Sequence, residues 1–189
     1  MKMKSFYLTL ALMLVSSFVY SQTSYKQAEN GNRIQINGTS SLHDWELASE
    51  NIKCKAELYI EEGEITGIKK IVVTMVANTL KSGKSGLDKN AYKTMNVSDD
   101  EPLISFIAFD MGPNGEASGI MKIAGSEEKE MDLAYTYEFK EGKLLIHSNT
   151  EVTFSQFGMK APSIMAGTIK VAEEVTLQVN LVLEEDNKP

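Results

Sequence analysis

Residues 175–183 read Val-Thr-Leu-Gln-Val-Asn-Leu-Val-Leu, with an apolar side chain at every second position. Successive side chains of a β-strand point to opposite faces, so this period of two places the apolar set on one face. The same alternation recurs in residues 34–36, 56–60 and 133–139. The chain is therefore predicted to be almost entirely β.

Short turns separate these apolar runs. Glu62-Gly63, Pro113-Asn114-Gly115 and Glu141-Gly142 each lie between two alternating segments. Gly and Asn tolerate the positive φ angles that tight hairpins require. About eight strands joined by such turns are expected, which is typical of an antiparallel meander.

Two of the expected strands, residues 71–76 and 103–109, are apolar on both faces. A strand of this kind needs cover on both sides, for example the interior of a barrel on one and a helix or a neighbouring strand on the other. If two copies of the chain pair along a barrel flank, residues 71–76 are a candidate surface for a homodimer.

One segment departs from the β pattern. Residues 81–84 are a Ser/Gly/Lys loop, and Leu87, Ala91 and Met95 then recur at a spacing of four, which predicts a short helix over 87–95. Asp88 is expected to cap its first turn. This helix is predicted to plug or flank the barrel.

The N-terminus has the pattern of a secretory signal. Lys2 and Lys4 precede the uncharged run 6–20, which is shorter than the roughly 20 apolar residues of a membrane-spanning helix. Ser21 supplies a small residue at the expected cleavage point. We therefore expect a signal peptide over 1–21 and one domain over 22–189, periplasmic or secreted and without stable membrane insertion; a retained anchor is the alternative.

Charge and cysteine content narrow the partners. Removal of Lys2 and Lys4 leaves 17 of the 19 basic residues against 26 acidic ones, a formal charge of −9. Such a surface repels phosphate backbones, so no nucleic acid partner is expected. Cys54 is the one cysteine, and its place in an alternating run predicts a buried small side chain rather than a reactive thiol.

Motifs for catalysis and cofactor binding are lacking in the sequence. It contains no Gly-rich phosphate loop, no Gly-x-Ser-x-Gly elbow and no Cys-x-x-Cys pair, so we expect neither an enzyme nor a cofactor. His43, Asp44 and His147 could ligate a metal only if the fold brought them together. The favoured interpretation of His147 is a hydrogen-bonded strand residue, and no metal site is expected.

His43, Asp44 and Trp45 form the densest cluster of unusual residues. Neighbours in a strand face opposite ways, so His43 and Asp44 would not act together, whereas Trp45 would share a face with His43. A structural corner with a buried Trp and a functional site are both compatible with this cluster.

An excess of apolar side chains has two interpretations, a solid core and a ligand cavity. Phe154, Phe157, Met159, Ile164 and Met165 surround the segment 155–167, where a loop would normally be polar. An apolar loop of this kind is typical of a covered cavity mouth, and Met adapts to irregular apolar partners. An eight-stranded barrel is just wide enough for one small ligand. From composition alone, a solid core filled by the same residues is favoured over a ligand cavity.

Four segments, in order, resemble the YceI-like family of exported polyisoprenoid-binding proteins. They are Leu42-His43-Asp44-Trp45, Ala91-Tyr92-Lys93-Thr94-Met95, Glu101-Pro102-Leu103-Ile104-Ser105-Phe106, and Phe157-Gly158-Met159-Lys160-Ala161-Pro162 with Gly167. The resemblance covers about residues 35–184. Many members carry Asp where this chain has Gln156, and His-Ser where it has His43-Asp44.

The resemblance implies an eight-stranded antiparallel lipocalin-like barrel with one short helix, no catalytic residues, and an isoprenoid or other long-chain lipid in its interior. The residues expected to bind that lipid are His43, Trp45, Met75, Tyr92, Met95, Phe106, Ala108, Phe154, Phe157, Met159 and Met165. Two other functions remain open: a filled barrel that acts as a periplasmic scaffold or stress-related interaction protein, and an enzyme that uses His43.

Overall fold

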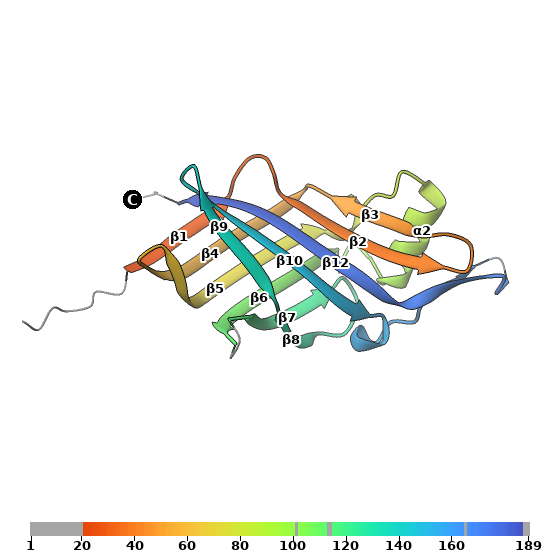
Figure 1. The fold of residues 1–189 in the computed structure, drawn as a ribbon. Coiled ribbons are helices and arrows are strands. Elements are labelled where there is room, and N and C mark those ends of the chain that lie inside the picture. Colours follow the sequence, from red (N-terminus) through yellow and green to blue (C-terminus); the bar gives the residue numbers. More distant parts are fainter. Residues whose placement is uncertain (1–20, 101, 113–114, 165, 187–189) are drawn as a thin grey trace, which may run out of the picture.

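The computed structural model describes residues 21–100, 102–112, 115–164 and 166–186 (Figure 1). Its strands are β1 (Ser21–Gln27), β2 (Arg33–Ser40), β3 (Trp45–Ser49), β4 (Ile52–Glu61), β5 (Glu64–Val76), β6 (Leu103–Met111), β7 (Ala117–Ile123), β8 (Lys129–Leu133), β9 (Tyr135–Lys140), β10 (Lys143–Thr153), β11 (Ser163–Ile164) and β12 (Ile169–Glu185). The helices are α2 (Ser85–Thr94) and two 3₁₀ turns, η1 (Ala77–Thr79) and η2 (Ser155–Phe157). The expected signal peptide lies almost wholly outside the described residues.

The predicted all-β antiparallel fold is confirmed, but the expected number of strands is wrong. The described residues form twelve strands. All of them except β11 share eight positions around a barrel, and β11 forms a short hairpin with β12. Three positions hold two strands each, because the chain bends within them: β1 with β2, β3 with β4, and β8 with β9. Alternation in the sequence gives the number of positions and does not show these bends.

The chain itself closes the barrel between β8 and β9. β8 pairs with β7, and β9 pairs with β10, so Ala134 is the point at which one strand position passes from one neighbour to the other. The Ser148 hydroxyl donates to the Ala134 carbonyl over 2.7 Å and holds this bend against β10. On the other side, β12 pairs with β10 along one edge and with β1 and β2 along the other.

Two of the expected turns have the geometry that their sequence predicts. Glu62-Gly63 connects the paired residues Glu61 and Glu64 with φ angles of 51° and 83°. Glu141-Gly142 connects β9 to β10 with φ angles of 52° and 73°. Positive φ at both central residues gives a two-residue hairpin whose twist matches that of the strands. In the third turn, Pro113 and Asn114 lie outside the described residues.

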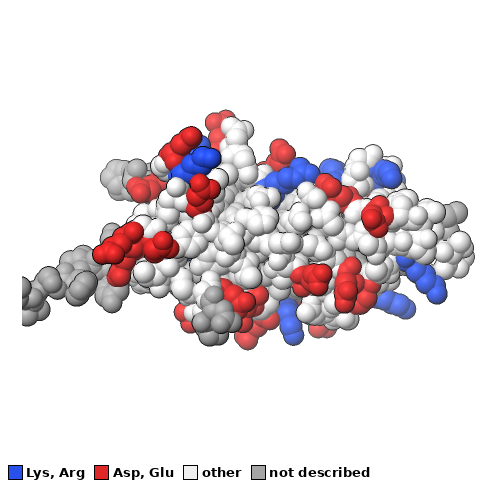
Figure 2. Space-filling model, viewed as in Figure 1, with Lys and Arg blue, Asp and Glu red and all other residues white. Residues whose placement is uncertain are grey.

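The period of two along β12 separates the two faces of the barrel wall. Leu177, Val179 and Leu181 point inward, whereas Gln178 and Asn180 point to solvent. Figure 2 shows that the outer surface over β10 and β12 carries mainly uncharged side chains, with charged ones nearer its borders. Outward amide groups keep this wall soluble while the inward apolar set is removed from water.

Helix α2 flanks one end of the barrel (Figure 1). Its stripe of Leu87, Ala91 and Met95 faces the interior, as the spacing of four predicts. The predicted role of Asp88 as a helix cap is wrong. Its carboxylate accepts from the backbone N–H and hydroxyl of Ser82 over 2.8 and 2.6 Å, and these bonds lower its pKa. Asp88 therefore fixes the loop before the helix.

The expectation of cover on both faces is wrong for β6 within the described residues. Leu103, Ile107 and Phe109 on the outer face of β6 are 46%, 39% and 52% exposed. On β5, Ile71, Val73 and Met75 face inward, so only the alternate residues 72, 74 and 76 reach the outside. Within the described part of the chain, no helix is sufficiently long and apolar to cross a membrane.

Candidate functional site

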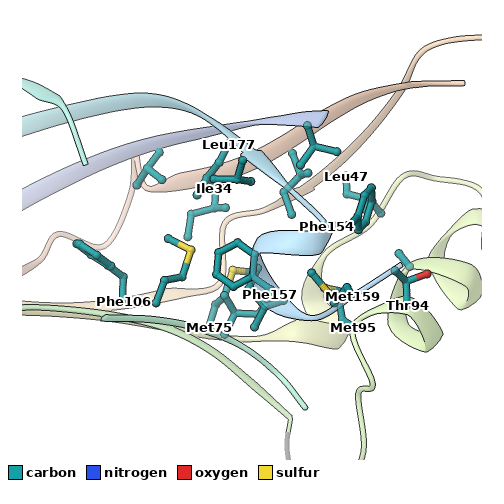
Figure 3. A pocket seen from close by; sticks show the side chains of 18 of the residues that line it. Ile34, Leu47, Met75, Thr94, Met95, Phe106, Phe154, Phe157, Met159 and Leu177 are labelled. Atoms are coloured by element: carbon teal, nitrogen blue, oxygen red, sulfur yellow. The ribbon is translucent and has the colours of Figure 1, made fainter. Parts of the chain in front are cut away.

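The interior of the barrel contains an apolar cavity of about 370 Å³ (Figure 3). Its walls come from the inward faces of the strands, and its helix-side end is bordered by α2, the β2–β3 loop and the segment 154–169. Pockets for small ligands have volumes of roughly 300–1,000 Å³ and mostly apolar walls. The cavity therefore has the size and the chemistry of a site for an apolar ligand.

The barrel interior is hollow from the α2 end towards the β4–β5 hairpin, where Ile65 still lines the cavity, and it is packed beyond the lining residues of β10 and β12. Ile146 and Leu181 form a cross-strand pair on the cavity wall, and so do residues 175 and 152 nearer the helix. The next inward pair in the other direction, Leu144 and Leu183, does not reach the cavity and is 0% exposed. Both interpretations of the apolar excess therefore hold, each for one part of the barrel.

A short 3₁₀ turn places two aromatic rings at the cavity. Phe154 precedes η2 and Phe157 ends it, and the Phe157 ring projects among the other lining side chains (Figure 3). Gly158 follows with φ of 64°, a conformation that glycine adopts without strain. The Phe157 carbonyl accepts from the Glu127 N–H over 3.1 Å, which ties the turn to the β7–β8 connection.

The Trp45 ring forms part of the cavity wall near the helix-side end. It packs over Gly38 so closely that a Cβ at that glycine would lie 2.2 Å from Trp45 Cζ2. The indole N–H donates to the Thr39 carbonyl over 3.2 Å. Gly38 thus provides the space in which the indole lies across β2, and Trp45 is both a structural corner and a wall of the site.

Polar groups gather at the helix-side end of the cavity. His43 lies in the exposed β2–β3 loop, and Lys84 and Asn90 belong to the α2 segment. His43 Nδ1 lies 2.8 Å from the Asp44 carbonyl oxygen, which can only accept. The ring therefore carries a proton on Nδ1, and Nε2 of the neutral ring can accept a hydrogen bond.

Most of the residues predicted to bind a ligand lie at this cavity. Eight of the eleven line it: His43, Trp45, Met75, Met95, Phe106, Phe154, Phe157 and Met159. Contact of these side chains with a ligand stays a prediction. Met165 lies outside the described residues.

Two predicted site residues do not line the cavity. The Tyr92 hydroxyl donates to the Leu80 carbonyl over 2.6 Å and accepts from Lys81 Nζ over 2.9 Å, so this residue anchors the helix to the loop before it. Ala108 is fully buried in the wall, where Gly119 on the neighbouring strand packs against it. Its small side chain ends below the cavity surface.

The two departures from the family motifs also lie away from the cavity wall. Asp44 is exposed, and Gln156 Oε1 accepts from the Thr153 N–H over 2.7 Å, which supports the η2 turn. Sequence reasoning missed the wall residues Leu177 and Val179, although their alternation indicates an inward face. For Lys84 and Asn90 the sequence carries no comparable signal.

The geometry separates the groups considered as metal ligands. His147 faces outward on β10, where its Nδ1 lies 2.7 Å from Asn180 Oδ1 on β12. His43 lies in the β2–β3 loop at the cavity. Among the described residues, no cluster of three or more His, Cys, Asp or Glu side chains is positioned to hold a metal ion. Burial raises the pKa of the Cys54 thiol to about 12, so this side chain is protonated at neutral pH.

The sequence profile of the YceI-like domain matches residues 24–183. The chain belongs to the YceI-like family. No curated protein sequence gives a significant match.

Solved structures show the same lipocalin-like fold for this YceI-like chain. BcnA from Burkholderia cenocepacia has a TM-score of 0.63 at 12% identity, over 80% of this chain and 95% of that one. A polyisoprenoid-binding domain from Saccharophagus degradans, implicated in plant cell wall breakdown, has a TM-score of 0.61 at 6% identity, over 87% and 99%. The Campylobacter jejuni YceI protein has a TM-score of 0.50 at 16% identity, over 71% and 82%.

Proposed function

We propose that this YceI-like chain is an exported lipid-binding protein that holds a long apolar chain of polyisoprenoid type inside its barrel. The observation that carries the proposal is the apolar cavity of about 370 Å³. Each CH₂ group moved from water into such a cavity contributes roughly 0.8 kcal/mol, so an isoprenoid needs few polar contacts to bind. The polyisoprenoid-binding neighbour from Saccharophagus degradans supports this ligand class.

The cavity also favours binding over the two alternatives. A scaffold or stress-related interaction protein would gain nothing from a hollow interior, which forgoes packing contacts. An enzyme would need further reactive groups beside the His43 ring, and the lining of the cavity is predominantly apolar. Export to the periplasm or the outside is proposed from the signal pattern of residues 1–21.

Lipid extraction tests the proposed function. The full chain is produced in a bacterial host, purified without detergent and extracted with organic solvent, and the extract is analysed by mass spectrometry. We expect a polyisoprenoid in a stoichiometric amount, or uptake of added polyprenol by protein that was purified empty. Protein that yields no lipid and takes up none would contradict the proposal.

Homodimer formation is a separate proposal, supported by the apolar outer row Val72, Ile107 and Ile120 on β5, β6 and β7. Burial of this row between two copies would remove it from water. Light scattering after size exclusion should give the mass of a dimer, and Ile107→Lys should give a monomer. A monomer mass for the unmodified chain at every concentration would contradict it.

A further inference from the structure

We propose that the cavity is a blind pocket which measures the length of a single-chain amphiphile: the tail enters first, and a layer of Leu144, Leu183 and Tyr137 stops it. This inference rests on the proposed function and adds to it the orientation and the length limit of the ligand. It follows from the difference between the two ends of the barrel interior.

Strand register shows where the hollow part ends. Along β10 and β12, the inward cross-strand pairs Val152–Val175, Ser148–Val179 and Ile146–Leu181 all line the cavity. The next inward pair, Leu144–Leu183, is completely buried and lies beyond it. A tail that advances along these pairs therefore meets packed leucine side chains directly after the Ile146–Leu181 level.

Leu144, Leu183 and Tyr137 together form the floor of the pocket. Tyr137 completes it by reaching across the barrel. It pairs with Ile146 on β10, and its phenolic oxygen accepts from the backbone N–H of Ile65 on β5 over 3.0 Å. The same hydroxyl donates to the Glu64 carboxylate. Because β9 and β5 are not neighbours in the sheet, these bonds span the end of the barrel and hold the ring over the opening.

The opposite end has the groups that a polar head requires. Lys84 and Asn90 can donate to a ligand oxygen, and Nε2 of the His43 ring can form a hydrogen bond with a hydroxyl. At the floor, by contrast, Tyr137 has both of its hydrogen-bonding roles satisfied within the protein. A polar head left at the helix-side end keeps its hydrogen bonds, whereas one pushed to the floor would lose them.

A length series tests the inference. Linear primary alcohols and all-trans prenols of stepwise increasing length are titrated against the full chain, with Trp45 fluorescence as the signal. While the tail still advances in the cavity, each added CH₂ should raise the affinity about fourfold. Beyond a certain chain length, the break, each further CH₂ group should leave the affinity unchanged. An affinity that rises without a break up to the longest chains would overturn the inference.

Two matched variants locate the floor. Leu183→Ala removes part of the floor and should move the break to longer chains. Leu177→Ala, on the same face of β12 at mid-cavity, should weaken binding at all lengths and leave the break unchanged. Leu183→Val provides a milder version if the alanine variant does not fold. An unchanged break in the folded floor variants would overturn the inference, and no binding at any length would overturn the proposed function as well.

Discussion

The Tyr137 hydroxyl accepts a hydrogen bond from the backbone N–H of Ile65 over 3.0 Å, across the end of the barrel. The two residues are 72 positions apart in sequence, on strands that do not pair. This bond links β5 and β9 directly, whereas the sheet connects these two strands only through the strands that lie between them. The filled end is thus tied together by a side chain as well as by its packed leucines.

We predict that Tyr137→Phe lowers the free energy of unfolding by about 1 kcal/mol, because the Ile65 N–H loses its acceptor. Chemical denaturation at neutral pH measures this change. Tyr59→Phe is the control, since the hydroxyl of Tyr59 makes no side-chain hydrogen bond among those described for this chain. Equal stability of the Tyr137 variant and the unmodified chain would show that the bond across the barrel contributes nothing.

Alkaline pH should destabilise the fold through Cys54. Its pKa is raised by burial from 9.0 to about 12, so above pH 9 the thiol ionises in the unfolded chain and stays protonated in the folded one. The unfolded state then binds fewer protons, and the stability that is fully present below pH 9 decreases by roughly 1.4 kcal/mol per pH unit towards pH 12.

Cys54→Ala isolates this contribution. The variant should be less stable at neutral pH because a buried sulfur is lost, and the gap to the unmodified chain should shrink as the pH rises above 9. Denaturation midpoints at several pH values measure the gap. A gap that stays constant from pH 7 to pH 11 would contradict the burial of the thiol.

Gly38→Ala should displace the indole of Trp45. The added Cβ would lie 2.2 Å from Cζ2, so the ring must move, at a cost of about 1–3 kcal/mol. Because Trp45 is the single tryptophan, its emission spectrum reports the movement directly. Gly86→Ala is the control: a Cβ there meets nothing within 4 Å, and alanine favours the helix. An unaltered spectrum in Gly38→Ala would exclude the close packing described here.

The sequence predicted the structural features that depend on neighbouring residues, and it missed those that depend on residues far apart in the chain. The period of two along 175–183 identified an inward face, and the Glu-Gly pairs identified hairpins, because both are local properties. The bends at Ala134 and between β3 and β4 were missed, since they arise from pairing between strands far apart in the chain. Apolar loop residues such as Phe157 lie at the cavity, as their unusual composition indicated, and their contact with a ligand stays a prediction.

Tyr92 and Ala108, which were also predicted to bind the ligand, do not line the cavity. Residue type indicated an aromatic and a small apolar side chain near a cavity, yet a local carbonyl, that of Leu80, captures the Tyr92 hydroxyl. Ala108 lies on the inward face, but its side chain is too short to reach the surface of the cavity beside Phe106. Side-chain length and hydrogen-bond partners decided both cases, and neither follows from the pattern of the sequence.

Filling the cavity should separate binding from stability. Val179→Phe adds volume into the hollow, so uptake of polyprenol should fall while the free energy of unfolding changes little. Ala108→Leu adds volume where the wall is already packed, and should cost about 1–3 kcal/mol of stability. Thermal unfolding and lipid uptake are measured on both variants. Equal destabilisation by both substitutions would indicate that the region around Val179 is solid.

The central claim is that the hollow interior of this barrel takes up one apolar chain, and native mass spectrometry of the full chain with added polyprenol tests it most directly. We expect a mass increase equal to one lipid molecule for the unmodified protein. In Val179→Phe this complex of protein and lipid should be lost. A spectrum that shows only the free protein at saturating polyprenol would contradict it.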